Sequence, residues 1–203
     1  MEHAWQPMAI PDVTARFVGS GADWWIAGGQ AIDLFLGWET RSHGDLDVEM
    51  FRSDRSVLFE VFEGWDLQAM SEGSLVPWSD PRNLADSVFG IWARPTPDQP
   101  WQVEIMLADG DRSEWRFRRD PSIRMPGERL IATTADGVPY CTPEVQLLYK
   151  SKMARPKDDV DLAHCLHRLN HQQRRWLIDA IATTAPDHPW AGVLEASLNQ
   201  QHE

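Results

Sequence analysis

Three carboxylates alternate with apolar residues in the segment DLDVEMF, residues 45–51. In an extended strand every second side chain points to the same side, so Asp45, Asp47 and Glu49 are expected on one face. A surface strand usually avoids this pattern because like charges side by side repel. The face is therefore either a solvated sheet edge or a divalent-metal site, since carboxylate oxygens bind Mg²⁺ together with substrate phosphates.

A glycine pair and a basic loop precede the acidic segment. Gly28 and Gly29 follow the apolar run WWIA at 24–27. A glycine turn that leads into a helix presents backbone N–H groups to an anion. Arg41 and His43 lie in the connecting loop, where they could meet phosphate oxygens. The three features in this order predict a site for a metal-bound phosphate compound.

These residues need strands and a short helix to position them. Apolar patterning predicts strands at 24–27 and 45–51, with a helix at 30–36 that ends at Gly37. The segment 75–83 is rich in Pro, Ser, Asp and Asn and is expected to be a loop. Further strands are expected at 65–70, 87–93, 102–107 and 115–118.

The character of the chain changes near residue 140, where strand patterns give way to helical ones. Pro143 suits the first position of a helix. We therefore expect an α+β fold with a sheet-containing region, 1–140, and a helical region, 141–203. The expected helices cover 144–153, 157–169, 172–184 and 190–198.

The segment WIAGGQAIDLFLGWETRSHGDLDVEMF resembles the signature of the polymerase-β-type nucleotidyltransferase superfamily. It is most similar to the branch that holds the aminoglycoside 2″-adenylyltransferases and lincosamide nucleotidyltransferases, whose pattern resembles GGWAxDxxxGxxTRxHxDxD. At Gln30 the chain departs from the aromatic or serine residue common there, and we include Gln30 in the nucleotide-binding set. The resemblance implies a mixed β-sheet nucleotidyltransferase core flanked by helices and followed by a C-terminal helical region. The matching residues are Gly28, Gly29, Ala31, Asp33, Gly37, Thr40, Arg41, His43, Asp45 and Asp47.

The resemblance also implies a third acidic residue on a later strand, which helps hold a second metal ion and takes the proton of the attacking hydroxyl. Glu104 is the only charged residue in the apolar run WQVEIML, 101–107. Burial of an unpaired carboxylate there would cost several kcal/mol, so we expect a metal or cationic partner. The alternative is the solvated side of an edge strand. Asp109 and Asp111 also remain candidates, although they sit in a turn.

The segment PKDDVDL, 156–162, resembles the KD-x-x-D pattern of several nucleotidyltransferase branches. That resemblance implies that Lys157 binds the triphosphate and that Asp158 orients the lysine. Acidic residues in a first helical turn also suit the helix dipole without any functional role. On a helical wheel Asp158 faces the protein body. Lys150 and Lys152 are further candidates for the triphosphate.

Together these features predict an enzyme that uses Mg²⁺, with Asp45, Asp47 and Glu104 as ligands of two ions. It would move a nucleoside monophosphate, AMP from ATP, onto a hydroxyl of a small molecule such as an aminoglycoside-like antibiotic. A purely structural protein with an acidic strand, which would bind no nucleotide, stays open from the sequence, and so do two nucleotide-binding alternatives. One is a non-catalytic nucleotide-binding module, and the other is a toxin-type nucleotidyltransferase that acts on RNA or protein.

The 203 residues include 19 Lys and Arg against 31 Asp and Glu, a formal net charge of −12. This balance argues against general nucleic-acid binding, which relies on clustered basic residues, and suits a small cationic partner or a carboxylate metal site. The best candidate basic face is expected to be ordinary solvated surface. It comprises Arg112, Arg116, Arg118, Arg119 and Arg124.

The sequence also bears on location. No apolar run is long enough for a membrane span, and the N-terminal segment MEHAWQPMAIPDV has no basic stretch followed by an apolar one. Two cysteines cannot build a disulfide framework. We therefore expect a cytoplasmic protein with no membrane partner.

Overall fold

A mixed β-sheet forms the centre of the computed structural model, which describes residues 4–199. Its main strand order is β4-β3-β5-β6-β2-β1-β10-β9, and β7 joins β6 to β8. The strands are β1 Trp24–Ile26, β2 Asp47–Phe51, β3 Asp66–Ser71, β4 Ser74–Pro77, β5 Gly90–Arg94, β6 Val103–Gly110, β7 Trp115–Arg116, β8 Arg124–Met125, β9 Ile131–Thr133 and β10 Pro139–Cys141.

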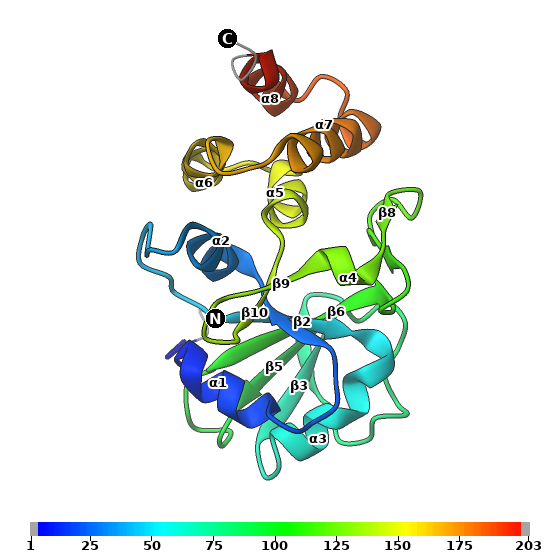
Figure 1. The fold of residues 1–203 in the computed structure, drawn as a ribbon. Helices are drawn as coiled ribbons and strands as arrows, with labels where there is room; N and C mark the ends of the chain where they lie inside the picture. Colours follow the sequence, from blue (N-terminus) through cyan, green and yellow to red (C-terminus); the bar gives the residue numbers. More distant parts are fainter. Residues whose placement is uncertain (1–3, 200–203) are drawn as a thin grey trace.

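Helices cover both faces of this sheet (Figure 1). On one face lie α1 and α3, and on the other lie α2 and then the C-terminal helices α5 to α8. The helices are α1 Ile10–Phe17, α2 Gly28–Leu36, the 3₁₀ helix η1 Arg52–Val57, α3 Leu58–Val61, α4 Gly127–Leu130, α5 Pro143–Ser151, α6 Pro156–Leu166, α7 His171–Thr184 and α8 Pro189–Asn199.

Strand β2 separates two environments because its side chains alternate between the faces. Val48 and Met50 are fully buried in the apolar cluster beneath the sheet, together with residues of α1 and α3. Asp47 and Glu49 point to the opposite face, toward the C-terminal helices. The alternation read from the sequence therefore places the carboxylates on the face that the C-terminal helices cover.

The strands that flank β2 show whether its carboxylates lie at the edge of the sheet or in its interior. β1 pairs with β2 in antiparallel fashion, and β6 pairs with it in parallel, with Asp47 opposite Glu104. β6 is itself flanked on its other side by β5. Glu104 therefore lies on an interior strand, and the alternative of a solvated sheet edge is wrong for both acidic strands.

Sequence rules locate the C-terminal helices well. α5 and α6 each begin with a proline, whose missing N–H and restricted φ suit a first helical position. α7 begins with a capping box in which the Asn170 side chain accepts from the Gln173 N–H at 2.9 Å. The four expected helices are thus present, with ends that differ by a few residues.

Two expected strand boundaries shift, and part of one expected loop is a strand. β2 begins at Asp47, so Asp45 lies in the bend before the strand. The segment 74–77 is strand β4, because it pairs with β3 at the sheet edge. β7 is only two residues long. These differences follow from cross-strand pairing, which local propensity does not contain.

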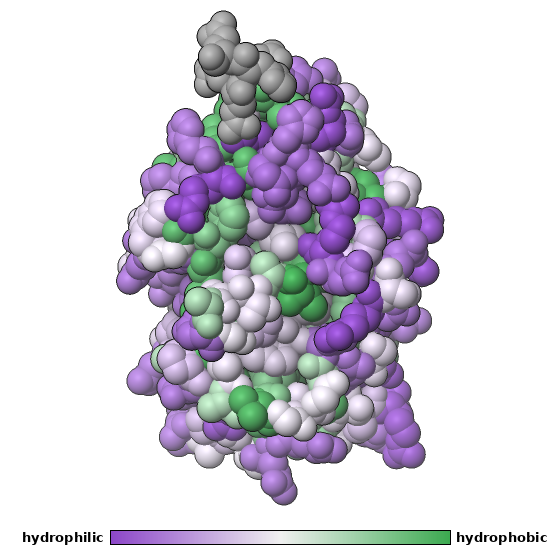
Figure 2. All heavy atoms as spheres, in the orientation of Figure 1, coloured by the Kyte–Doolittle hydropathy of each residue, from purple (hydrophilic) through white to green (hydrophobic). Residues whose placement is uncertain are grey.

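The expected division near residue 140 falls within β10, which pairs with β1 and β9. Helices α5 to α8 share one apolar cluster with Trp25 of β1 and Ile32 of α2. The division into 1–140 and 141–203 remains a prediction. None of the helices within residues 4–199 is long and apolar enough to cross a membrane. Hydrophilic side chains cover most of the face drawn in Figure 2, as the charge of the chain leads one to expect.

Candidate active site

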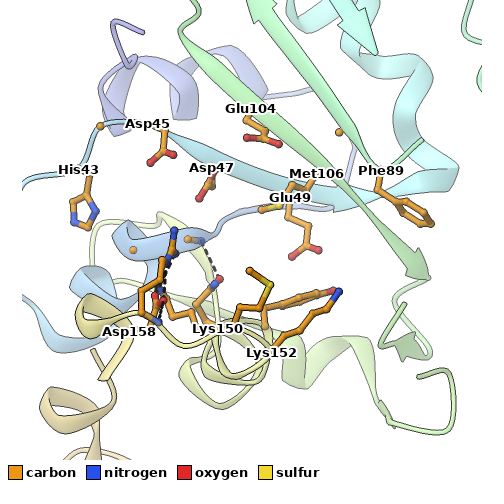
Figure 3. Close-up of a pocket in the computed structure, with 18 of the residues that line it drawn as sticks. His43, Asp45, Asp47, Glu49, Phe89, Glu104, Met106, Lys150, Lys152 and Asp158 are labelled. Carbon is orange, nitrogen blue, oxygen red and sulfur yellow. Dashed lines mark hydrogen bonds and ion pairs between the residues drawn. The ribbon is translucent and has the colours of Figure 1, made fainter. Parts of the chain in front are cut away.

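A cavity of about 890 Å³ lies between the sheet and the α5–α6 region (Figure 3). Residues from β2, β6, the start of α2, the basic loop and the start of α6 line it together. The sequence-predicted residues that line this cavity are Gly28, Gly29, Arg41, His43, Asp45, Asp47, Glu104, Lys150, Lys152, Lys157 and Asp158.

Asp45, Asp47 and Glu104 form an electrostatically strained group on the sheet side of the cavity. Burial, together with the nearby charges of Asp45 and Glu104, raises the pKa of Asp47 from 3.8 to about 7. Burial likewise raises the pKa of Glu104, while a hydrogen bond with Trp92 opposes that change. Within residues 4–199, no hydrogen bond or ion pair reaches the carboxylates of Asp45 or Asp47.

A divalent cation fits this group by charge. Nearby unpartnered carboxylates that face a cavity are stabilised when a metal ion replaces the missing positive charge. In the part of the chain that the structure describes, however, no three His, Cys, Asp or Glu side chains converge closely enough to form a metal cluster. The donor atoms are therefore suited to a cation, but their side chains must close around it.

The glycine turn is shaped by the side chains packed against it. Gly28 opens α2 with φ of +66°, and a Cβ there would overlap Asp47 Oδ2. A Cβ on Gly29 would overlap the Arg41 guanidinium and the His43 ring. Only glycine therefore allows the carboxylate and the basic loop to approach this backbone. The Gly28 N–H donates to Gln146 Oε1 at 2.9 Å, so this N–H already has a partner from α5.

Asp33 of α2 holds the basic loop in place. It accepts hydrogen bonds from the Thr40 N–H and hydroxyl, at 3.1 and 2.6 Å, and lies 2.5 Å from His43 Nε2. His43 Nδ1 in turn lies 3.1 Å from Arg41 Nη1. Asp33 and Thr40, which match the signature, thus have a positioning role. They hold the loop so that Arg41 and His43 face the cavity.

Lys150 is neutralised by the protein itself. Its Nζ lies 3.2 Å from Asp158 and 2.8 Å from Asp161, and both carboxylates are almost completely buried. Asp161 also pairs with Arg41 at 3.4 Å, which ties α6 to the basic loop. Lys150 therefore lines the cavity with its charge already shared between two acids.

The resemblance implied that Asp158 orients Lys157, but Asp158 contacts other residues. Burial raises its pKa, but hydrogen bonds from Arg155 and the charge of Lys150 outweigh burial and lower the pKa to about 2. Its carboxylate accepts from the Arg155 backbone N–H and Nε at 3.0 and 2.9 Å. The structure thus pairs Asp158 with Lys150 and Arg155, whereas Lys157 is an exposed residue at the cavity rim.

Gln30 lies apart from the other predicted nucleotide ligands. It lines a second hollow of about 690 Å³, on the other side of the basic loop, with Asp33, Trp38 and Asp136. Its Oε1 is buried and makes no hydrogen bond within the described residues. Because successive helical side chains point about 100° apart, the residue after Gly29 faces away from the main cavity.

Several cavity residues were given no role from the sequence. Glu49 faces the cavity, and its Oε2 accepts from Trp25 Nε1 at 2.9 Å. The strand alternation placed Glu49 on the same face as Asp45 and Asp47, but no binding or catalytic role was assigned to it. Gln146 and Tyr149 carried no signal, because their roles depend on how α5 packs against the sheet.

The arginine series divides into two groups. Arg112 pairs with Asp23 at 2.6 Å, and Arg116 and Arg124 pair with Glu114 at 2.8 and 3.6 Å. These three form the solvated face that was expected. Arg118 and Arg119 are also exposed, as expected, but in addition they line the cavity.

Comparisons with known proteins bear on the fold and on the signature segment. Residues 9–74, about a third of the chain, match the family model for aminoglycoside-2″-adenylyltransferase. The solved structure of a lincosamide antibiotic adenylyltransferase, LnuA bound to lincomycin, is 14% identical with a TM-score of 0.53. The similarity covers 78% of this chain and 97% of that one. ANT(2″)-Ia in complex with adenylyl-2″-tobramycin is 18% identical with a TM-score of 0.49, and the similarity covers 96% of this chain and 97% of that one. No curated protein sequence matches the chain.

The matched segment and the shared fold resemble those of nucleotidyltransferases, a class of enzymes with a mixed sheet flanked by helices. Within that class the chain resembles the branch of the aminoglycoside 2″-adenylyltransferases and lincosamide nucleotidyltransferases. Both the fold class and the family resemblance predicted from the sequence are therefore confirmed.

Proposed function

We propose that this protein is a Mg²⁺-dependent nucleotidyltransferase that moves a nucleoside monophosphate, AMP from ATP, onto a hydroxyl group of a small molecule. The observation that carries this proposal is the register of β2 and β6, which sets Asp47 beside Glu104 next to the Gly28–Gly29 turn. Carboxylates, a glycine turn and facing cations in one cavity are what transfer of a phosphate-containing group requires.

Asp45, Asp47 and Glu104 are the residues that would hold Mg²⁺, as two ions according to the family resemblance, once their side chains close around it. When bound, such ions polarise phosphate oxygens and stabilise both the entering and the leaving oxygen of an in-line displacement. The raised pKa of Asp47 is in keeping with this assignment, because it reflects burial together with the nearby charges of Asp45 and Glu104, which Lys150 offsets only in part.

The chain's own residues account for binding and proton transfer. The triphosphate lies over the Gly28–Gly29 turn, with Arg41, His43 and Lys157 available to its oxygens. Glu104 takes the proton from the acceptor hydroxyl, whose oxygen bonds to the α-phosphorus as the bond to pyrophosphate breaks. Arg41 and Lys157 neutralise charge on the departing pyrophosphate. Lys150 and Asp158 act together as a neutral, fixed wall of this subsite.

We further propose that the acceptor is a small antibiotic-like alcohol. The family model that matches the chain is named for an aminoglycoside-modifying enzyme, and LnuA was solved with lincomycin. General nucleic-acid binding is not part of this proposal, because three of the five candidate arginines are paired with surface acids. Free, buried cysteines at 141 and 165 are consistent with a cytoplasmic location.

Pyrophosphate release from ATP and Mg²⁺, measured with a panel of aminoglycosides, lincosamides and total tRNA, tests the proposal. We expect release with a small alcohol and none when Asp47 is replaced by alanine. Asp109→Ala is the matched control, because Asp109 lies on the same strand as Glu104 but outside the cavity, and it should keep full activity. Unchanged turnover in Asp47→Ala would refute the mechanism. Binding of ATP without any pyrophosphate release would instead favour a non-catalytic nucleotide-binding module.

A further inference from the structure

The cavity has a second end that the nucleotide residues do not occupy. Glu49 lies two residues beyond Asp47 on β2, about 6–7 Å along the strand. Met106 of β6 is its neighbour in register, and Phe89 precedes the strand that pairs with Met106. Figure 3 shows Glu49, Met106 and Phe89 together, away from His43 and Asp158.

The geometry of in-line attack indicates which reactant lies at the Glu49 end of the cavity. In an in-line displacement the attacking oxygen approaches the α-phosphorus from the side opposite the leaving pyrophosphate. The Gly28–Gly29 turn lies near the start of β2, because Ala27 donates to the Asp47 carbonyl oxygen at 2.9 Å. If the pyrophosphate lies at that turn, as the proposed function requires, the acceptor approaches from the Glu49 end.

The walls of this end are mostly apolar. Phe89, Met106 and Tyr149 line it. Met153, in the connection between α5 and α6, lines the same cavity with 79% of its surface exposed. Methionine and aromatic side chains adapt to flat or irregular apolar surfaces. An acceptor that fits here carries an apolar face.

The Glu49 end of the cavity has more positively charged side chains than negatively charged ones. Glu49 is the acid at this end of the cavity, and Trp25 Nε1 holds its Oε2 at 2.9 Å. Arg118, Arg119 and Lys152 line the same cavity, and within the described residues none of the three makes an ion pair. Glu49 can bind one ammonium or hydroxyl group, whereas the three cations repel any further positive charge.

We propose that the Glu49 end is the acceptor subsite and that it selects a hydroxyl compound with an apolar face and a single amine or hydrogen-bond donor for Glu49. Polycationic acceptors are excluded by Arg118, Arg119 and Lys152. Glu49 is thus a specificity-determining residue that contacts the acceptor and not the nucleotide. This inference rests on the proposed function.

Isothermal titration of the full chain, with Mg²⁺ and a non-hydrolysable ATP analogue present, tests the inference. Lincomycin, which has one basic amine and an apolar body, and polycationic tobramycin serve as probes. We expect lincomycin to bind at least tenfold more tightly than tobramycin. Glu49→Gln keeps an acceptor for Trp25, and it should weaken lincomycin at least tenfold while the Kd of the nucleotide analogue changes less than twofold.

Two further variants keep the test informative if Glu49→Gln does not fold. Phe89→Ala changes a partly exposed wall and should also weaken lincomycin alone. Replacement of both Arg118 and Arg119 by glutamate should tighten tobramycin at least tenfold. Tighter binding of tobramycin than of lincomycin by the unmodified protein, or no binding of either probe, would overturn the inference. Equal weakening of nucleotide and lincomycin by Glu49→Gln would also overturn it.

The failure of this inference is distinguishable from that of the proposed function. If the unmodified protein does not bind the ATP analogue, the proposed nucleotidyl transfer itself is refuted. If the analogue binds in a Mg²⁺-dependent way but the probes behave otherwise than expected, only the acceptor subsite is refuted.

Discussion

Replacement of Asp47 by asparagine should make the metal-free protein more stable while it abolishes activity. Burial and the charges of Asp45 and Glu104 raise the pKa of Asp47 from 3.8 to about 7. A difference of about three in pKa is equivalent to about 4 kcal/mol. Asp47 is only half-buried and lines the open cavity, and solvent there screens part of the repulsion, so we expect a gain of about 2–4 kcal/mol.

The sign of the pH dependence follows from proton binding. Between pH 3.8 and about 7 the folded protein holds a proton on Asp47 that the unfolded chain has lost. The free energy of unfolding therefore falls as the pH rises through this window, and the full penalty is present above pH 7. Asparagine carries no charge, so its advantage should be largest at pH 8 and should disappear near pH 3.8.

The assay is urea unfolding followed by tryptophan fluorescence, in EDTA, at pH 8 and pH 5. In a thermal unfolding experiment the same gain corresponds to an increase in Tm of about 5–15 °C for a chain of this length. Added Mg²⁺ should stabilise the unmodified protein and leave Asp47→Asn unchanged. A variant that is less stable than the unmodified protein at pH 8 in EDTA would refute the reasoning.

Asp158→Asn is the matched control, because Asp158 is a cavity aspartate in the opposite electrostatic situation. Ion pairs with Lys150 and Arg155 lower its pKa to about 2 despite burial. Its ionised form therefore stabilises the fold above pH 3.8, and this stability is lost as the pH falls toward 2. We expect Asp158→Asn to be less stable than the unmodified protein at pH 8.

Three other changes have defined outcomes. Gly28→Ala should abolish pyrophosphate release because the new Cβ overlaps Asp47 Oδ2. Gly37→Ala is the control: Gly37 has φ of +83° and open space around it, so this variant should lose about 1 kcal/mol of stability and keep its activity. Asp161→Asn should lower the free energy of unfolding by about 3 kcal/mol, since buried Lys150 loses a partner; an equal urea midpoint would contradict this. EDTA should stop pyrophosphate release and Mg²⁺ should restore it, and activity that survives EDTA would argue against a metal.

The part of the site that is local in sequence was predictable. Gly28, Gly29, Asp45 and Asp47 lie within one short segment, and all four line the cavity, although Asp45 lies in the bend before the strand. The family resemblance implied a third acidic residue on a later strand, and Glu104 was chosen because a single charge in an apolar strand needs a partner. The helix starts at Pro143 and Pro156 were equally visible, because proline restricts the backbone locally.

Partner choice was not predictable, because it depends on contacts between distant segments. Asp158 pairs with Lys150 and Arg155, where the family pattern implied Lys157. Gln146 reaches the Gly28 N–H only because α5 packs beside α2. Long side chains have many rotamers, and the one that is adopted is decided by the packing around it.

The sequence by itself determined the α+β fold, which depends on the periods of strand and helix, and it identified the two aspartates through their local spacing. The class of the protein was implied by the resemblance of its signature to a known family. Only the tertiary structure decided that Glu104 stands beside Asp47 and that Glu49 forms a second end of the cavity. It also decided which cations are already neutralised. Burial, strand register and ion pairing arise from segments far apart in the chain, so no local pattern contains them.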